Sequence, residues 1–187
     1  MHANRIGVEL DVIRRYEVSH MTYPYGVHAA EVEVDVETGR IHIERYLVAY
    51  DVGRAVNPVL VEGQIAGGME QGLGGALMED LAYDDAGQLL SGTFMDYLLP
   101  GSCEVPDVEV IITEDAPSRC NPLGIKGSGE GGTTGVGAAI ANAVANALDA
   151  PPEAFTRLPL RPAAVLKWLR REAAHQDSAF SKKVGAS

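Results

Sequence analysis

Apolar and polar residues alternate most clearly over residues 27–36 and again over residues 41–50. The four residues between these runs are Glu-Thr-Gly-Arg, a polar segment with a glycine. Two runs of period two around such a segment are typical of a β-hairpin. Alternating carboxylates on the outer face of a strand are usually solvated. We therefore interpret these carboxylates as surface residues rather than as a metal site: Glu31, Glu33 and Asp35.

Residues 59–80 change to a spacing of four, which predicts a helix with one apolar stripe formed by Ile65, Met69, Leu73 and Leu77. This segment is rich in glycine, and each interior helical glycine costs about 1 kcal/mol relative to alanine. The surplus indicates close approach of either another backbone or a flat ligand, and the spacing leaves both interpretations open. The helix spacing places on one face Gln64, Gly68, Gln71, Gly72 and Gly75.

The rest of the chain mixes both periods without a regular strand–helix–strand series, which predicts an α+β fold of β-hairpins packed with helices. Further strands are expected over residues 89–98 and 108–113, and weak alternation favours another over residues 4–20. Helices are expected from Thr133 or Thr134, either of which can serve as N-cap, to Leu148, and from Pro162 to about Ala174. We divide the chain into a poorly defined lead-in (1–25), one domain segment (26–169) and a basic tail expected to be flexible (170–187).

The formal net charge of −11 argues against binding to nucleic acid or to an anionic membrane surface. The two cysteines, Cys103 and Cys120, have no spacing typical of a disulfide framework, an iron–sulfur cluster or a zinc site. The five histidines form no ligand pattern either, so we predict no metal-ligating residue and interpret them as surface or hydrogen-bonded core residues. No signal peptide or long apolar run is present, and we expect a cytoplasmic protein without membrane insertion.

Residues 121–137 contain seven glycines and directly precede an alanine-rich helix pattern. A glycine loop at a helix start can hold an anion such as a phosphate, and Lys126 would add a point charge. The loop matches neither standard phosphate-binding motif, because Lys126 is not followed by Ser or Thr. A carboxylate opposes anion binding, so Glu130 either caps the helix or takes part in proton chemistry.

Two segments carry a specific combination of residues. The first has Asn57-Pro58 followed by Glu62-Gly63-Gln64, and the second has Lys126-Gly127 followed by Gly129-Glu130. From about Gly26 to Trp168, their content and order resemble the C-terminal portion of the molybdenum-binding large subunit of the xanthine dehydrogenase, aldehyde oxidoreductase and aerobic carbon monoxide dehydrogenase family.

The resemblance implies the C-terminal portion of a molybdopterin-binding domain. It implies that Glu130 is the general base beside the molybdenum. The cofactor is expected to be molybdopterin, in the cytosine dinucleotide form. Cofactor contacts are expected from Gly63, Gln64, Gly67, Gly68, Lys126, Gly127, Ser128 and Gly129.

The resemblance also implies partners, because the chain has neither the cysteine set of iron–sulfur centres nor a dinucleotide fold. We expect the rest of the molybdenum subunit, a 2Fe–2S chain and an FAD chain, in a dimer of such heteromers. The reaction would be hydroxylation of an aldehyde, purine or N-heterocycle carbon with water. Two alternatives stay open: a non-catalytic cofactor-binding or assembly subunit of the same type of complex, and a stand-alone nucleotide-binding domain.

Overall fold

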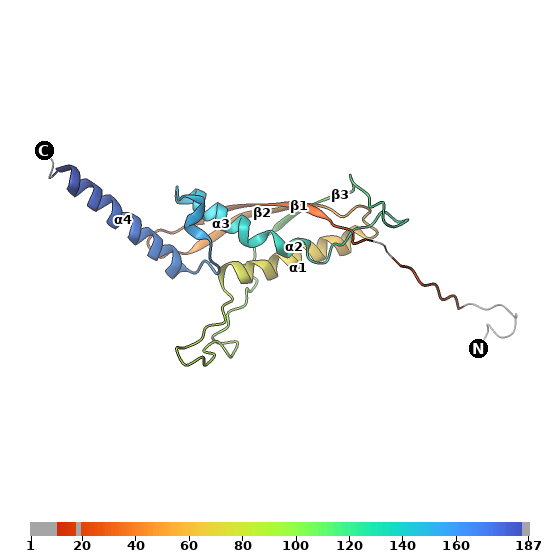
Figure 1. The fold of residues 1–187 in the computed structure, drawn as a ribbon, viewed down its shortest axis with the longest axis horizontal. Coiled ribbons are helices and arrows are strands. Elements are labelled where there is room, and N and C mark those ends of the chain that lie inside the picture. The colour runs from red at the N-terminus through yellow and green to blue at the C-terminus, as the bar shows by residue number, and fades with distance from the viewer. Residues whose placement is uncertain (1–10, 18–19, 185–187) are drawn as a thin grey trace.

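The computed structural model describes residues 11–17 and 20–184. Within them, a three-stranded sheet has the order β1-β2-β3. Strands β1 (Tyr25–Val34) and β2 (Ile41–Asp51) pair antiparallel, and β2 and β3 (Val108–Thr113) pair parallel. Together with the helices, this mixed sheet confirms the α+β prediction (Figure 1).

The hairpin β1–β2 is confirmed by the structure, and its turn follows from Asp35. One carboxylate oxygen of Asp35 accepts hydrogen bonds from the backbone N–H groups of Glu37 and Thr38, at 2.9 and 3.2 Å. The chain then passes through Gly39 with φ +74°, a conformation that favours glycine. Glu31 and Glu33 are exposed, as predicted for a solvated face.

Helix α1 (Pro58–Leu77) confirms the second periodic segment. Its N-cap is Asn57, whose side-chain oxygen accepts from the Leu60 N–H at 3.2 Å. Proline occupies the first helical position, where its missing N–H is not needed. Ile65, Met69 and Leu73 of the predicted stripe are fully buried.

The helices packed on the sheet lie on one side of the strands (Figure 1), and the core fills the space between them and that face of the sheet. Alternate residues of β2, including Tyr46 and Val48, meet the stripe of α1 and the apolar side of α3 (Val136–Ala147). Helix α4 (Pro162–Val184) follows a 3₁₀ turn, η2 (Pro152–Phe155). Arg161 ties its start to the end of α1 through the Met78 carbonyl at 3.0 Å. None of the helices in the described residues is both long and apolar enough to cross a membrane.

The predicted strand over residues 89–98 is wrong. Only Leu89 forms an isolated bridge, with Tyr83, and the chain then turns at Thr93, whose carbonyl accepts from the Asp96 and Tyr97 N–H groups. Phe94 and Met95 lie at this turn and are 84% and 87% exposed. The apolar residues thus resembled a strand in composition, but they do not pair with the sheet.

Two other boundaries differ from the prediction. Residues 11–17 and residue 20 form no regular structure. The other residues of the weak alternation, 4–10 and 18–19, lie outside the described residues. Helix α4 continues to Val184 instead of ending near Ala174, because residues 170–184 contain no glycine or proline to stop it. Most of the predicted flexible tail is therefore helical.

The glycine-loop helix is divided into α2 (Gly131–Thr134) and α3, with Gly135 between them. It therefore starts earlier than predicted, and neither helix has a side-chain N-cap hydrogen bond. The predicted cap residue Thr133 instead donates its hydroxyl to the Gly68 carbonyl of α1, at 2.9 Å. This bond joins α2 to α1.

Candidate functional site

The glycine loop lies against the end of β2. Gly53 and Ile125 form an isolated antiparallel bridge, and the Lys126 N–H donates to the Val52 carbonyl at 2.9 Å. Gly53 has φ +67°, and a Cβ atom there would collide with the Gly124 carbonyl oxygen. Only glycine allows the two backbones to approach this closely. The contact fixes the loop relative to the sheet just before residues 127–130.

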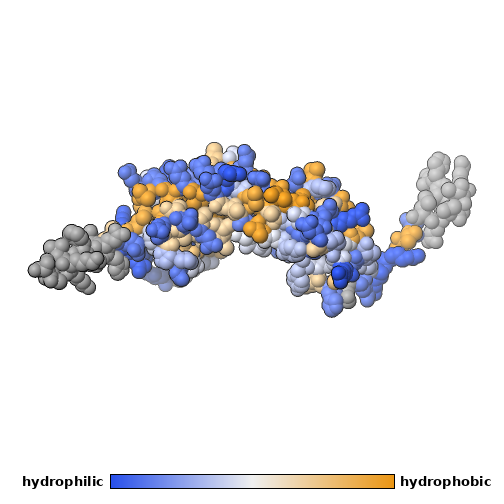
Figure 2. Space-filling model, turned by 90° about the horizontal axis from the view of Figure 1, so that it is seen from above, coloured by the Kyte–Doolittle hydropathy of each residue, from blue (hydrophilic) through white to orange (hydrophobic). Residues whose placement is uncertain are grey.

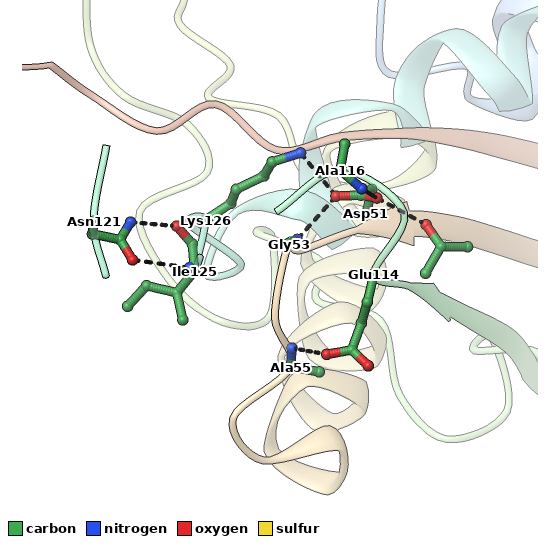
Figure 3. Close-up of polar contacts among 9 residues, drawn as sticks. Asp51, Gly53, Ala55, Glu114, Ala116, Asn121, Ile125 and Lys126 are labelled. Atoms are coloured by element: carbon green, nitrogen blue, oxygen red, sulfur yellow. Dashed lines mark hydrogen bonds and ion pairs between the residues drawn. The ribbon is translucent and has the colours of Figure 1, made fainter. Parts of the chain in front are cut away.

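Asp51, the last residue of β2, is the centre of a polar cluster (Figure 3). One of its oxygens accepts from the Gly53 N–H at 2.9 Å and from the Lys126 ammonium at 2.8 Å. The other accepts from the Ala116 N–H at 3.0 Å and from the Thr113 hydroxyl at 3.3 Å. The carboxylate thereby joins β2, the end of β3 and the glycine loop.

This ion pair is enclosed, with 2% of the Asp51 side chain and 8% of the Lys126 side chain exposed. Burial alone would raise the pKa of Asp51. The hydrogen bonds from Lys126, Gly53 and Ala116 outweigh burial and lower that pKa to about 2. Asp51 is therefore ionised at neutral pH and holds the Lys126 ammonium in place.

The pairing changes the role expected of Lys126. Its ammonium contacts Asp51 and lies 4.4 Å from the centre of the Tyr25 ring. The point charge predicted for a bound anion is thus neutralised by Asp51, because a buried carboxylate without a partner cation would be strongly unfavourable. Lys126 holds the loop, and the residues after it are the ones left free to meet a ligand.

Two further side chains shape the loop, and Figure 3 shows both. The Asn121 amide donates to the Ile125 carbonyl at 2.9 Å and accepts from the Ile125 N–H at 3.1 Å. Glu114, just beyond β3, accepts from the Ala55 N–H at 2.6 Å. All three bonds use side chains to satisfy loop backbone groups, which keeps an irregular segment in one conformation.

Glu130 is exposed and stands at the N-cap position of α2. Its backbone carbonyl accepts from the Thr133 N–H at 3.0 Å, but its carboxylate makes no capping hydrogen bond. Burial raises the pKa of Tyr50, and the charge of the nearby Glu130 raises it further. The capping interpretation of Glu130 is therefore not supported, and its carboxylate remains available for proton chemistry beside Tyr50.

The start of α2 packs directly on one turn of α1. A Cβ atom on Gly132 would collide with the Ile65 carbonyl oxygen, and one on Gly68 would lie 3.1 Å from the Gly132 Cα. Gly68 is therefore covered by α2, so the close-backbone interpretation holds for it. Gly72 packs in the same way, against Val136 of α3.

The other glycines of α1 have a different environment. A Cβ atom at Gly63, Gly67 or Gly75 would meet nothing within 4 Å, and Gln64 and Gln71 are exposed. The single predicted face thus divides into a packed side and an open side. In the loop, Gly127 and Gly129 are open in the same sense, and Ser128 is half-buried. The packed side of α1, at Gly68 and Gly72, contacts α2 and α3, whereas Gly63 lines a pocket with Val108 and Val110 of β3.

Sequence reasoning missed four residues of this region: His28, Tyr46, Tyr50 and Asp51. The only signal for Asp51 was a charged residue at the end of a buried strand, two residues before a glycine. His28 agrees with the interpretation of the histidines as hydrogen-bonded residues, since both ring nitrogens have partners. Among the described residues, no group of three or more His, Cys, Asp or Glu side chains could hold a metal ion.

Comparisons with known proteins identify the family. The sequence profile of the molybdopterin cofactor-binding domain matches residues 2–106. The gamma subunit of the 6-hydroxypseudooxynicotine dehydrogenase complex of Paenarthrobacter nicotinovorans is 44% identical over 156 residues, which cover 83% of this chain and 19% of that subunit. An alignment covering that share of the chain includes its middle, and with it the residues from Asp51 to Glu130.

Solved structures agree with the sequence relatives. Reconstituted CO dehydrogenase from Oligotropha carboxidovorans has a TM-score of 0.79 at 31% identity, covering 86% of this chain and 20% of that one. Quinoline 2-oxidoreductase from Pseudomonas putida 86 has a TM-score of 0.72 at 38% identity, covering 78% and 18%. The chain thus spans about a fifth of the length of the proteins that it matches. It belongs to the molybdopterin cofactor-binding domain family of the molybdenum hydroxylase large subunits.

Proposed function

We propose that this chain forms part of the molybdenum-containing catalytic subunit of an oxidoreductase that hydroxylates a carbon of an aldehyde, purine or N-heterocycle with oxygen from water. One observation carries the proposal. Glu130 has an exposed carboxylate without a capping bond, on a backbone held between the sheet and α1. A fixed base with a free carboxylate is what proton abstraction requires.

The residues present fit a molybdopterin. Flat or extended groups can approach a backbone closely only where side chains are absent, and Gly63, Gly67, Gly127 and Gly129 all face open space. Gln64 is exposed on the same turn of α1 and offers both a donor and an acceptor to a pterin. Lys126 takes part through its pair with Asp51, and Gly68 through its packing under α2.

Molybdopterin, for which we propose the cytosine dinucleotide form, supplies a molybdenum centre that takes up two electrons from the substrate. Glu130 accepts the proton of the water-derived hydroxyl whose oxygen forms the new bond to carbon. Asp51 and Lys126 hold the preceding loop, so that the backbone of residues 127–129 keeps its place beside the cofactor. The charge of Glu130 raises the pKa of Tyr50 beyond the effect of burial, so the Tyr50 hydroxyl keeps its proton beside this site.

We infer that the remaining parts of the reaction lie on other chains or chain segments. The two electrons need an exit, for which we propose a 2Fe–2S subunit and an FAD subunit. The rest of the molybdenum subunit would close the pocket around Glu130, which is exposed in this chain. We further propose a dimer of heteromers in the cytoplasm. Purification of the tagged chain from its host, with assay of molybdenum, iron and flavin, tests this composition.

Replacement of Glu130 by Gln in the complete enzyme tests the base. Glutamine keeps the shape but cannot accept the proton, so kcat should fall by a factor of about 10²–10⁴ while molybdenum and pterin contents stay unchanged. Glu33, an exposed glutamate on β1, provides the matched control, and Glu33→Gln should have wild-type kcat. Undiminished turnover in Glu130→Gln would refute the base and leave a non-catalytic cofactor contact.

A further inference from the structure

His28 on β1 makes two hydrogen bonds across the interface between the sheet and the helices. Its Nδ1 lies 2.9 Å from the Tyr46 hydroxyl, and its Nε2 lies 3.0 Å from the Gly131 carbonyl oxygen. A carbonyl only accepts, so Nε2 carries the hydrogen, and Nδ1 accepts from the Tyr46 O–H. Burial lowers the pKa of His28, against the raising effect of its bond to Gly131, so the ring is neutral at pH 7.

The Gly131 carbonyl needs this donor because of the break between α2 and α3. In a continuous helix the Gly135 N–H would donate to the Gly131 carbonyl. Here the Gly135 N–H is directed to the Thr133 carbonyl instead. Gly131 is buried, and a buried carbonyl without a partner is unfavourable. The imidazole of His28 therefore takes the place of the missing helical donor.

Packing fixes the His28 ring in the position that this bond requires. A Cβ atom on Gly135 would collide with the His28 ring, and one on Gly131 would collide with the Tyr50 ring. The His28 and Tyr46 rings meet edge to face, with centroids 5.9 Å apart. Tyr46 is 2% exposed, so its hydroxyl has no access to bulk water as an alternative partner.

We propose that His28, held by Tyr46, is a positioning residue that fixes the backbone at Gly131 and thereby the direction of the neighbouring Glu130 carboxylate. The catalytic part of this inference rests on the proposed function. The positioning itself does not, since it follows from the hydrogen bonds on either side of the imidazole. Its two parts can therefore be tested by separate measurements on the same enzyme.

The first measurement is hydrogen–deuterium exchange by mass spectrometry on the complete enzyme. His28→Phe keeps a ring but loses both hydrogen bonds. Amide exchange over residues 131–135 should increase about tenfold, as expected for loss of the buried bond to the Gly131 carbonyl. Exchange of β2 should stay unchanged. His28→Gln retains an N–H donor and should restore slow exchange. His42→Phe is the matched control, because the His42 side chain is 72% exposed and its imidazole lies beside the Glu44 carboxylate, away from Gly131.

The second measurement is activity per bound molybdenum. For His28→Phe we expect kcat to fall at least about tenfold with KM little changed, because a displaced base affects the chemical step more than binding. His28→Gln should recover most of the lost kcat. A faster exchange with normal kcat would overturn the catalytic part of the proposal, and unchanged exchange would overturn the positioning.

A double-mutant cycle separates this effect from general destabilisation. Gly135→Ala inserts a methyl group into the His28 ring position, so alone it should raise exchange at residues 131–135 like His28→Phe. In a His28→Ala background the methyl group has room, and Gly135→Ala should add little. If the increases in amide exchange caused by Gly135→Ala and His28→Ala simply add in the double variant, the proposal is overturned. If Glu130→Gln keeps its turnover, the proposed function fails, but this exchange cycle still decides whether His28 positions Gly131.

Discussion

Asp51 makes the arrangement of the glycine loop depend on one carboxylate. Its four hydrogen bonds join segments that are up to 75 residues apart. Removing one partner of a buried ion pair leaves the other charge uncompensated. For Lys126→Met we therefore expect the free energy of unfolding to fall by about 3–5 kcal/mol, measured by denaturant unfolding. Adding Asp51→Asn to Lys126→Met should recover part of this loss. If the double variant loses as much free energy of unfolding as the Asp51→Asn and Lys126→Met single variants added together, the pairing is contradicted.

The same carboxylate predicts a pH dependence. The pKa of Asp51 is about 2 in the folded chain and 3.8 by its ordinary value, so the unfolded chain binds the proton more readily. The stabilisation from Asp51 is present above about pH 4 and is lost as the pH falls toward 2. Unfolding curves collected across this range should show the loss. In Lys126→Met the folded-state pKa of Asp51 rises toward its ordinary value, so this loss of stability between about pH 4 and 2 should become smaller, and an unchanged loss would contradict the assignment.

At the scale of the elements, the glycines of α1 separate into two groups with opposite expected effects. A Cβ atom at Gly72 would lie 2.6 Å from the Val136 Cγ2 atom of α3, so Gly72→Ala should lower the free energy of unfolding by about 1–3 kcal/mol. Gly75 faces open space, so Gly75→Ala should raise it by about 0.5–1 kcal/mol through helix propensity. Denaturant midpoints of the two variants compare them directly. Equal destabilisation by both would show that the packed and open sides of α1 have been assigned wrongly.

Much of this element structure could be predicted from periodicity, and most of the site's internal bonding could not. The hairpin and α1 have strong, uninterrupted patterns, and local physics alone sets their form. The strand expected over residues 89–98 is missing because pairing depends on a partner strand that composition does not reveal. Asp51, His28 and the break at Gly135 depend on contacts between segments far apart in sequence. The glycine content marked the loop, and the carboxylate within it marked Glu130. The roles of both at a molybdenum cofactor came only from the resemblance, which no period or spacing in this chain would have supplied.

At the scale of the whole molecule, the helices cover one face of the sheet and leave the other open. On that face, which is open among the described residues, Val27, Ala49 and Ile111 are neighbours across the three strands, and Val27 and Ile111 are 66% and 42% exposed. Figure 2 shows hydrophobic side chains on the side seen from above, where Figure 1 places the strands. Apolar patches of this kind mark contact sites. Because the chain spans about a fifth of its relatives, we expect the rest of the large subunit to cover this face.

Substitution of the face tests this expectation. Val27→Asp combined with Ile111→Asp should reduce the amount of this chain recovered in the assembled enzyme several-fold, measured by affinity purification and quantitative mass spectrometry. Val36, which is 58% exposed at the far end of the hairpin, is the control, and Val36→Asp should assemble normally. Normal assembly of the double variant would show that the face stays in contact with water.

The parallel pairing of β2 and β3 has a consequence for synthesis of the chain. Thr113 and Asp51, which end the two paired strands, are 62 residues apart. At ribosomal rates of about 5–20 residues per second, roughly 3–12 s separate the emergence of these two residues. During that interval the hairpin is complete, but β2 has an unpaired edge on which another nascent chain can form a strand. Because of this order of the strands, the edge of β2 in the nascent chain is open to mispairing for seconds. A chaperone that binds β2 would prevent such mispairing most effectively before residue 113 is synthesised.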